Sequence, residues 1–236
     1  MADSTLTMDE RDTEAGGSLG GGSSIGGSSP GVAAARARVL AHRRSPAHDL
    51  VDEMRAGSGE AVQLREVPFL TQVAVRASSG SRTAQALGAA LGLSLPTRAG
   101  EVAGAADGNG VAVLWLSPDE MLAVGPDEAD SGVSPEVWVG ELAEAVAGEP
   151  GQVVDVSANR TTLELSGPRA LSVLQKSCEL DLHPRAFAVG QAVATLLDST
   201  GVILWRTGEE TWRVLPRASF ATHVVRWLLD GMREYR

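Results

Sequence analysis

This 236-residue chain has a single cysteine, and its cysteine and histidines do not show the spacing of zinc ligands. The single cysteine, Cys178, excludes an internal disulfide, which is typical of proteins from a reducing compartment. The four histidines do not stand at metal-ligand spacing from one another or from Cys178. The sequence therefore predicts no local zinc motif, and we expect Cys178 to be a small buried hydrophobe on a helix face.

Long apolar runs and an excess of basic residues are also missing. No apolar run approaches the roughly 18 residues of a membrane span, and the first twelve residues carry four acids where a secretory signal would carry Lys or Arg. With 30 acidic and 20 basic residues the formal net charge is −10, which argues against a nucleic-acid binder. We expect a cytoplasmic protein with no membrane and no nucleic acid among its partners.

The sequence also lacks the common catalytic motifs. It contains no G-x-x-x-x-G-K-[ST], and its matches to G-x-S-x-G fall only within the Gly/Ser-rich residues 1–31. Its glycine clusters lack the strand–helix setting of a dinucleotide site. The paired carboxylates Glu209 and Glu210 fall in an expected turn, where they are most simply solvated. We therefore predict no catalytic, cofactor-binding or metal-binding residue on this chain.

The N-terminal region differs in composition from the rest. Residues 1–31 hold eight glycines and six serines, too little apolar surface to offset the cost of ordering. Residues 32–44 contain strong helix formers, which predicts a transient helix. We therefore interpret residues 1–44 as a disordered Gly/Ser-rich extension and expect the folded part to begin near Ser45.

A repeated pattern follows the extension. In the first half, residues 72–77 alternate as a half-buried strand does, residues 111–116 form an apolar run typical of a central strand, and residues 120–124 follow as another strand. Ser81 and the Ser134-Pro135 pair are expected to begin helices. The second half predicts strands at 162–165, 193–197, 202–205 and 211–215, a helix after Ser166-Gly167-Pro168 and a last helix capped by Ser219.

The two halves share a register. Val113 and Ile203, and likewise Trp115 and Trp205, lie 90 residues apart in similar segments. We predict an α+β fold of two similar β-α-β-β-β-α halves, residues 45–150 and 151–236.

The aromatic residues make up only 4% of the chain, and five of them are tryptophans. We expect Trp115, Trp138, Trp205 and Trp227 in the core and Trp212 partly exposed. In the last helix Phe220, Val224, Trp227 and Leu228 are expected to point inward, beside a second apolar stripe formed by Val225, Leu229 and Met232. Because a helix apolar over so wide an arc usually has something on each side, the second stripe predicts a protein partner.

The polar segment Asp181–Arg185 contains His183. This histidine either touches a partner or ligand, or orients its own loop through hydrogen bonds. The sequence leaves both interpretations open.

Several separated motifs together resemble the family of sarcosine oxidase gamma subunits, from about Ser45 to the C-terminus. Their order along the chain makes the resemblance specific, although any one of them alone is weak. The motifs are Arg65–Gln72 (REVPFLTQ), Ser117–Glu120 (SPDE), Val154–Ser157 (VDVS), Asn159–Thr161 (NRT), Leu165–Ala170 (LSGPRA), Asp181–Phe187 (DLHPRAF) and Leu204–Arg206 (LWR).

The resemblance implies a fold similar to the folate-binding aminomethyltransferases and a place in a heterotetramer with alpha, beta and delta subunits. Such a complex demethylates sarcosine oxidatively to glycine and hydrogen peroxide, and passes the one-carbon unit to tetrahydrofolate. The family implies FAD, NAD and the folate site on alpha, covalent FMN on or near beta, and zinc on delta. It implies no cofactor on the gamma chain itself.

The chain departs from the folate enzymes where they carry an acidic residue, on the hairpin after L-x-D-x-x-G-G. Residues 197–206 place bulky or basic side chains there, so we expect the folate chemistry to be lost. Within the gamma family, Ala158 stands where a His often follows D-V-S.

We therefore predict a non-catalytic gamma subunit that supports larger subunits through apolar surface and arginines. The alternative is a stand-alone folate-dependent aminomethyltransferase or a folate-binding scaffold. The residues predicted to contact partner subunits are Arg65, Phe69, His183, Arg185, Trp212, Val225, Leu229 and Met232.

Overall fold

A computed structural model describes residues 30–236, so the prediction of disorder for residues 1–29 lies outside the described part. The chain divides after His42 into two units. In the first unit, helix α1 (Pro30–Ala41) occupies most of the segment for which the sequence predicts a helix. Residues 30–41 are thus helical, as expected where Ala and Arg dominate.

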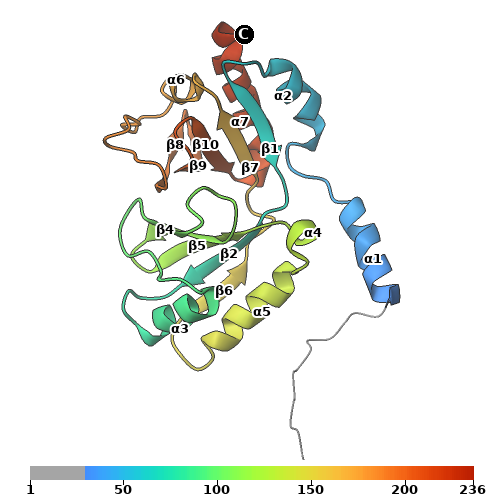
Figure 1. Ribbon diagram of the computed structural model, residues 1–236, viewed down its shortest axis with the longest axis vertical. Coiled ribbons are helices and arrows are strands. Elements are labelled where there is room, and N and C mark those ends of the chain that lie inside the picture. The colour runs from blue at the N-terminus through green and yellow to red at the C-terminus, as the bar shows by residue number, and fades with distance from the viewer. Residues whose placement is uncertain (1–29) are drawn as a thin grey trace, which may run out of the picture. The chain divides into compact units, whose positions relative to one another are not determined.

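The second unit, from Arg43 onward, contains two five-stranded sheets in which every neighbouring pair of strands is antiparallel (Figure 1). The first sheet has the order β3-β4-β5-β2-β6 and the second the order β1-β7-β10-β9-β8. The strands of the first sheet are β3 (Val102–Gly104), β4 (Ala112–Ser117), β5 (Glu120–Gly125), β2 (Thr71–Arg76) and β6 (Gln152–Asp155). Those of the second are β1 (Gln63–Val67), β7 (Thr162–Ser166), β10 (Thr211–Pro216), β9 (Thr200–Arg206) and β8 (Ala192–Leu197).

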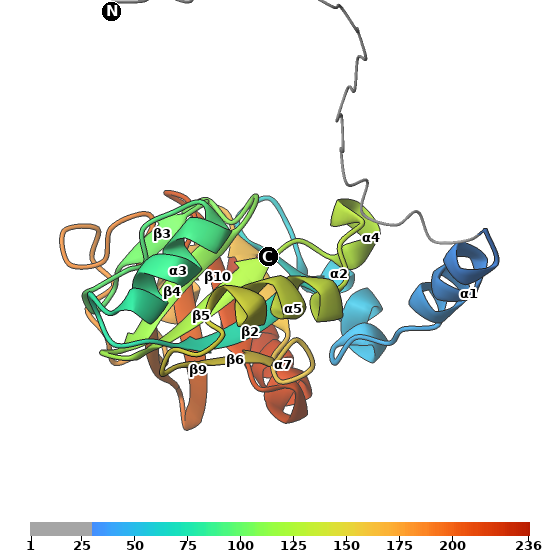
Figure 2. The ribbon, with the colours of Figure 1, turned by 90° about the horizontal axis from the view of Figure 1, so that it is seen from below.

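Helices cover the outer faces of both sheets. The helices α3 and α5 pack beside each other on the first sheet (Figure 2), and α2, α6 and α7 lie over the second (Figure 1). Their bounds are α2 (Val51–Gly57), α3 (Arg82–Leu91), α4 (Glu128–Ser131), α5 (Pro135–Ala145), α6 (Ala170–Leu174) and α7 (Ala221–Met232), with 3-10 turns η1 (His48–Leu50), η2 (Ala218–Phe220) and η3 (Arg233–Tyr235).

Three apolar clusters hold these layers together. One lies between the first sheet and its helices around Val73 and Leu87, and one between the second sheet and its helices around Leu163 and Trp212. The third lies between the two sheets and includes Leu114 and Trp205. Both faces of each sheet are therefore covered, and the mixed α+β class is confirmed.

Each sheet takes one edge strand from the other part of the sequence. Strand β6 follows residue 150 but pairs with β2, while β1 precedes β2 but pairs with β7. Apart from these edge strands, the first sheet has the order β3-β4-β5-β2 and the second the order β8-β9-β10-β7. The strands of the two sheets therefore follow the same order relative to their sequence. The chain thus crosses between the sheets just before β2 and just before β7.

Some local predictions agree with the structure and others do not. Ser81 and Ser134 cap α3 and α5, where their side chains accept hydrogen bonds from the Ala84 and Val137 amides. Cys178 is buried, as expected, but it follows α6 in an isolated bridge to Leu197 rather than lying on the helix. Strand β2 is not half-buried, however, because the second sheet covers the face opposite α3 and α5.

The start of the last helix differs from its prediction. Residues 218–220 form the 3-10 turn η2, and Phe220 precedes α7 with no side-chain cap. Ser219 therefore does not cap this helix. Phe220 and Trp227 point outward, with exposed fractions of 47% and 40%, whereas Val224 and Leu228 are buried as expected.

None of the helices among residues 30–236 combines the length and the apolar character needed to cross a bilayer.

Candidate functional site

The second stripe of α7 lies inside the protein. Val225 and Met232 have no exposed surface and Leu229 retains only 8%. The helices α2 and α6 cover this side of α7, and α2 approaches so closely that a Cβ on Gly57 would stand 2.4 Å from the Leu229 side chain. The arc is apolar because α7 packs between the sheet and two other helices, so the prediction that these three residues form an open docking stripe is wrong.

Trp212 is also buried, contrary to the expected partial exposure. Its ring lies 5.4 Å from that of Phe187, and the Arg206 guanidinium stands 5.2 Å from its centroid. Arg206 donates hydrogen bonds to the carbonyls of Phe187 and Glu209, which closes the 187–191 loop over the indole. Trp212 is thus a core residue with no surface to offer a partner.

An aromatic stripe that was not expected from the sequence lies on the outer side of η2 and α7. Phe220, His223 and Trp227 are exposed and spaced three and four residues apart, and the rings of His223 and Trp227 stack at 6.1 Å. The spacing was visible in the sequence, but Phe220 and Trp227 were expected to face inward.

His183 is held by local hydrogen bonds. Its amide donates to the Asp181 carboxylate at 2.9 Å, and its Nδ1 accepts from the Arg185 amide at 3.2 Å. Of the two interpretations left open, the structure shows that His183 orients its loop. Both His183 and Arg185 are exposed, so their predicted contact with a partner remains a prediction.

Arg65 belongs to a charged triad across three strands. Arg65, Glu164 and Arg213 face one another in register on β1, β7 and β10. Arg65 Nε donates to Glu164 Oε1 at 2.8 Å, and Arg213 Nε stands 3.6 Å from Glu164 Oε2. One partly buried carboxylate, 13% exposed, therefore balances two guanidinium groups.

Arg213 also connects the two sheets. It donates to the Gly108 carbonyl at 2.8 Å, in the loop between β3 and β4, and lies 5.4 Å from the Trp205 ring. Burial lowers the pKa of its guanidinium, and the Glu164 charge opposes that effect. Arg213 thus fills the space between the sheets at this end of the layer.

Phe69 occupies the turn where the chain passes from β1 to β2. Its backbone is left-handed, with φ +61°, which is unusual for a bulky residue. The Arg43 guanidinium stands 4.1 Å above its ring and binds both oxygens of Asp127 at 2.9 Å. Arg43 therefore fixes the Phe69 ring, and the folded part begins two residues before Ser45.

Arg65 and Phe69 meet at one cleft of about 460 Å³ beside α2 and β1, which we call the α2–β1 cleft. Its apolar wall includes Val51, Met54 and Phe69. This cleft brings two of the predicted interface residues, Arg65 and Phe69, together.

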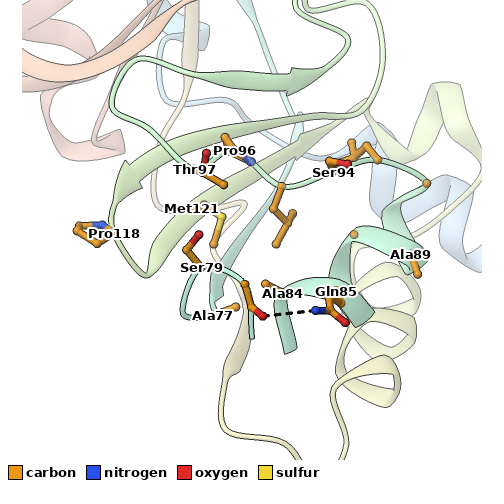
Figure 3. A pocket seen from close by; sticks show the side chains of 15 residues that line it. Ala77, Ser79, Ala84, Gln85, Ala89, Ser94, Pro96, Thr97, Pro118 and Met121 are labelled. Atoms are coloured by element: carbon orange, nitrogen blue, oxygen red, sulfur yellow. Dashed lines mark hydrogen bonds between the residues drawn. The ribbon is translucent and has the colours of Figure 1, made fainter. Parts of the chain in front are cut away.

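A second hollow, of about 620 Å³, lies between α3 and the β4–β5 hairpin (Figure 3). Met121, Pro96 and Ala84 give it an apolar wall, and Gln85 on its rim donates to the Gly80 carbonyl at 3.4 Å. No charged side chain lines it. No local sequence pattern indicates this hollow, because it forms where the 92–97 loop passes α3.

The hairpin that corresponds to the folate enzymes' L-x-D motif carries Asp198 at an exposed tip. A hydrogen bond from the Ser199 amide, with a second from its hydroxyl, lowers the pKa of the Asp198 carboxyl. Across residues 30–236 no group of three or more His, Cys, Asp or Glu side chains is placed to hold a metal ion.

Comparison with known proteins gives consistent results. Residues 76–234 match the family described as "Sarcosine oxidase, gamma subunit family". The chain is 57% identical to a sarcosine oxidase subunit gamma from Arthrobacter sp., and 52% identical to one from Corynebacterium sp. (strain U-96). Each comparison covers 82% of this chain and 91% of the relative.

Solved structures agree. A chain of the heterotetrameric sarcosine oxidase from Corynebacterium sp. U-96, in complex with pyrrole 2-carboxylate, matches with 51% identity and a TM-score of 0.75, over 82% of this chain and 96% of that chain. The glycine cleavage system aminomethyltransferase T from Bartonella henselae matches at 18% identity and a TM-score of 0.51, over 76% of this chain and 48% of that one, which shows a shared fold alone. On these grounds, the chain belongs to the sarcosine oxidase gamma subunit family.

Proposed function

We propose that this chain is the gamma subunit of a heterotetrameric sarcosine oxidase and assembles with alpha, beta and delta subunits. The complex would demethylate sarcosine oxidatively to glycine and hydrogen peroxide and pass the one-carbon unit to tetrahydrofolate. The observation that carries the proposal is the 51% identity and TM-score of 0.75 to a chain of a heterotetrameric sarcosine oxidase, of which 96% is covered. We place the complex in the cytoplasm, without membrane or nucleic-acid partners.

Within this complex we assign the chain a non-catalytic role. The layer between its sheets is filled by apolar side chains and by Arg213, which binds the Gly108 carbonyl. Glu164, the carboxylate beside this layer, already pairs with two arginines. We therefore place FAD, FMN, NAD, tetrahydrofolate and zinc on the partner subunits and none on this chain.

We also infer that the fold consists of two copies of one β-α-β-β-β-α unit, residues 45–150 and 151–236. The matching strand order of the two sheets and the 90-residue offset of Trp115 and Trp205 support this inference. The aminomethyltransferase-like fold would then serve as a scaffold.

Co-expression with the other three subunits tests the assembly. We expect the chain to co-elute with them on gel filtration, in a complex that forms hydrogen peroxide from sarcosine. A chain that stays monomeric beside the assembled partners would contradict the proposal.

The fold shared with an aminomethyltransferase favours one other candidate, a stand-alone folate enzyme or folate-binding scaffold. Titration of the purified chain with tetrahydrofolate, followed by tryptophan fluorescence, separates the two. We expect no saturable binding in the micromolar range, and saturation there would favour the folate protein.

A further inference from the structure

Two arginines face each other beside the start of α7. An isolated antiparallel bridge places Arg160 opposite Arg217, and the neighbouring Ala218 amide donates to the Asn159 carbonyl at 2.9 Å. Among residues 30–236 neither guanidinium forms an ion pair with a carboxylate, whereas most other arginines of the second unit do. The chain as a whole carries 30 acidic residues against 20 basic ones, so this pair is opposite to the charge balance of the molecule.

Arg160 is half-buried and held in place by the backbone around it. Its Nη1 donates to the Leu215 carbonyl at 3.2 Å, and its own carbonyl accepts from Gln72 Nε2 at 3.0 Å. Burial lowers the pKa of the Arg160 guanidinium, and the charge of Arg217 lowers it further. A carboxylate that pairs with both guanidinium groups would offset this repulsion.

The carboxylates next to this pair in the fold are engaged by other donors. Asp155 accepts from the Ser157 amide at 2.9 Å and from the Ser157 hydroxyl at 2.6 Å. Glu66, on the strand beside β7, accepts from the Thr161 hydroxyl and is turned toward the N-terminal segment. Neither carboxylate serves as counter-charge for the two arginines.

The charges on α7 are likewise accounted for. The other charged groups on this helix form ion pairs of their own, Arg226 with Glu53 and Asp230 with Arg233. Asp198, at the tip of the β8–β9 hairpin, lies close enough to His223 for their charges to interact. The positive charge of Arg160 and Arg217 therefore remains for a group from outside the described chain.

An exposed aromatic stripe continues from Arg217 along the helix. Phe220 stands three residues later, across the single turn of η2, and 3-10 geometry places side chains at this spacing on one side. His223 and Trp227 follow, and among residues 30–236 Phe220 and Trp227 are the only aromatic side chains in the set of large exposed apolar ones. Aromatic and arginine side chains are those that contribute most at protein interfaces. We call Arg160, Arg217, Phe220, His223 and Trp227 the arginine–aromatic surface.

Resting on the proposed function, we infer that the arginine–aromatic surface receives a segment of another subunit of the oxidase that carries one carboxylate followed by apolar side chains. The carboxylate pairs with Arg160 and Arg217, and the apolar side chains pack on Phe220 and Trp227. Because both cations lie at one end of the stripe, the acidic residue sits at the N-terminal end of α7. Charge complementarity thus fixes the direction of the bound segment.

Competition for the partner subunits tests the charged end. The wild-type chain and the variant Arg217→Glu are co-expressed with the other three subunits, and complexes are isolated through a tag on one of the partners. Mass spectrometry gives the ratio of the two chains in the complex and in the unbound pool. The matched control is Arg82→Glu, at an exposed arginine on α3, and circular dichroism with thermal melting of each purified chain reports folding.

We expect the Arg217→Glu chain to fold and to be incorporated about tenfold less than wild type, which corresponds to roughly 1.4 kcal/mol. Arg82→Glu should stay within about twofold of wild type. A folded Arg217→Glu chain that competes as well as wild type would overturn the inference. A wild-type chain that fails to co-elute with its partners would instead refute the proposed function and, with it, this surface.

The aromatic end has its own variant and control. Phe220→Ser/Trp227→Ser should also reduce incorporation by about tenfold, because it removes the apolar contact and leaves the arginines. Val133→Ser/Val137→Ser makes a similar change at two exposed valines and should have little effect. Equal incorporation of these two folded double variants would count against the surface.

Cross-linking identifies the occupant directly. Phe220→p-benzoylphenylalanine in the assembled complex should cross-link, on irradiation, to a peptide of another subunit with an Asp or Glu next to the cross-linked position. Replacement of that acid by its amide should lower incorporation and add nothing to the effect of Arg217→Glu, as expected for two groups in one contact. A cross-link to a second copy of this chain, or no cross-link to any subunit, would overturn the inference.

Discussion

The burial of each tryptophan in a strand depends on what covers the face of the strand that carries it. Trp205 is buried as expected, in the layer between the sheets. Trp212 alternates with Arg213 in the sequence, which favours a half-exposed strand, yet both are buried because the sheet has helices on one face and the other sheet on the opposite face. Alternation can identify the two faces of a strand but not what covers them.

Replacement of Trp205 tests the inter-sheet layer. We expect Trp205→Ala to lower the free energy of unfolding by about 3–5 kcal/mol, because the indole is 1% exposed and leaves a cavity. Urea denaturation followed by circular dichroism measures this change. Trp227→Ala, at a 40% exposed site on α7, is the control, with an expected loss within about 1 kcal/mol. A loss below about 1 kcal/mol for Trp205→Ala would show that the layer is not packed as described.

Glu164 is the second residue whose removal should be costly. Glu164→Gln would remove the carboxylate that pairs with the Arg213 side chain, which is only 6% exposed. Breaking a buried pair in this way costs about 3 kcal/mol or more, so we expect a loss of that size in urea denaturation. Glu120→Gln, which breaks the exposed pair with Arg76 at 3.4 Å, should cost less than about 1 kcal/mol. Equal effects of the two substitutions would contradict the charged triad.

At the scale of elements, helix starts were predictable where the cap is local. Ser81 and Ser134-Pro135 begin helices in the structure because cap residue, first turn and apolar face are adjacent in sequence. Ser219 has the same local appearance, but the 217–220 segment is drawn into a 3-10 turn, with the Ala218 amide bound to the Asn159 carbonyl. That contact spans about sixty positions of sequence and no local pattern reports it.

The different contributions of Ser81 and Ser219 to stability can be measured by substitution. Ser81→Ala removes the hydrogen bond from the Ala84 amide, 3.1 Å long, and should cost about 1 kcal/mol. Ser219→Ala removes a side chain that caps no helix, so its cost should stay below about 0.5 kcal/mol. Chemical denaturation of both variants provides the comparison. If Ser219→Ala were the more damaging change, the assignment of η2 would be wrong.

At the scale of the whole molecule, the sequence pattern predicted most strands but not their partners. The apolar runs and turn residues identified β4, β5, β9 and β10 within a residue or two. Nothing in them indicates that β1 pairs with β7 about a hundred residues later, or that β6 returns to β2. The buried location of α7's second stripe depends on the same non-local packing, since α2 reaches α7 only because β1 joins the second sheet. For this reason the α2–β1 cleft could not be predicted from the sequence. Arg65 and Phe69, which line it, were identified through a family motif rather than through periodicity.

The exchange of edge strands predicts how the chain behaves when divided after residue 150. A fragment of residues 151–236 lacks η1, α2 and β1, and with them the core residues Leu50, Met54 and Leu64. A fragment of residues 43–150 retains these elements but lacks β6 and the sheet on which they pack. Because each fragment holds a strand that belongs to the other's sheet, we expect neither to unfold cooperatively alone. The two fragments expressed together should associate and restore one cooperative transition by thermal circular dichroism. Cooperative unfolding of the isolated 151–236 fragment would show that β1 and α2 are dispensable, and that the two sheets fold independently of each other.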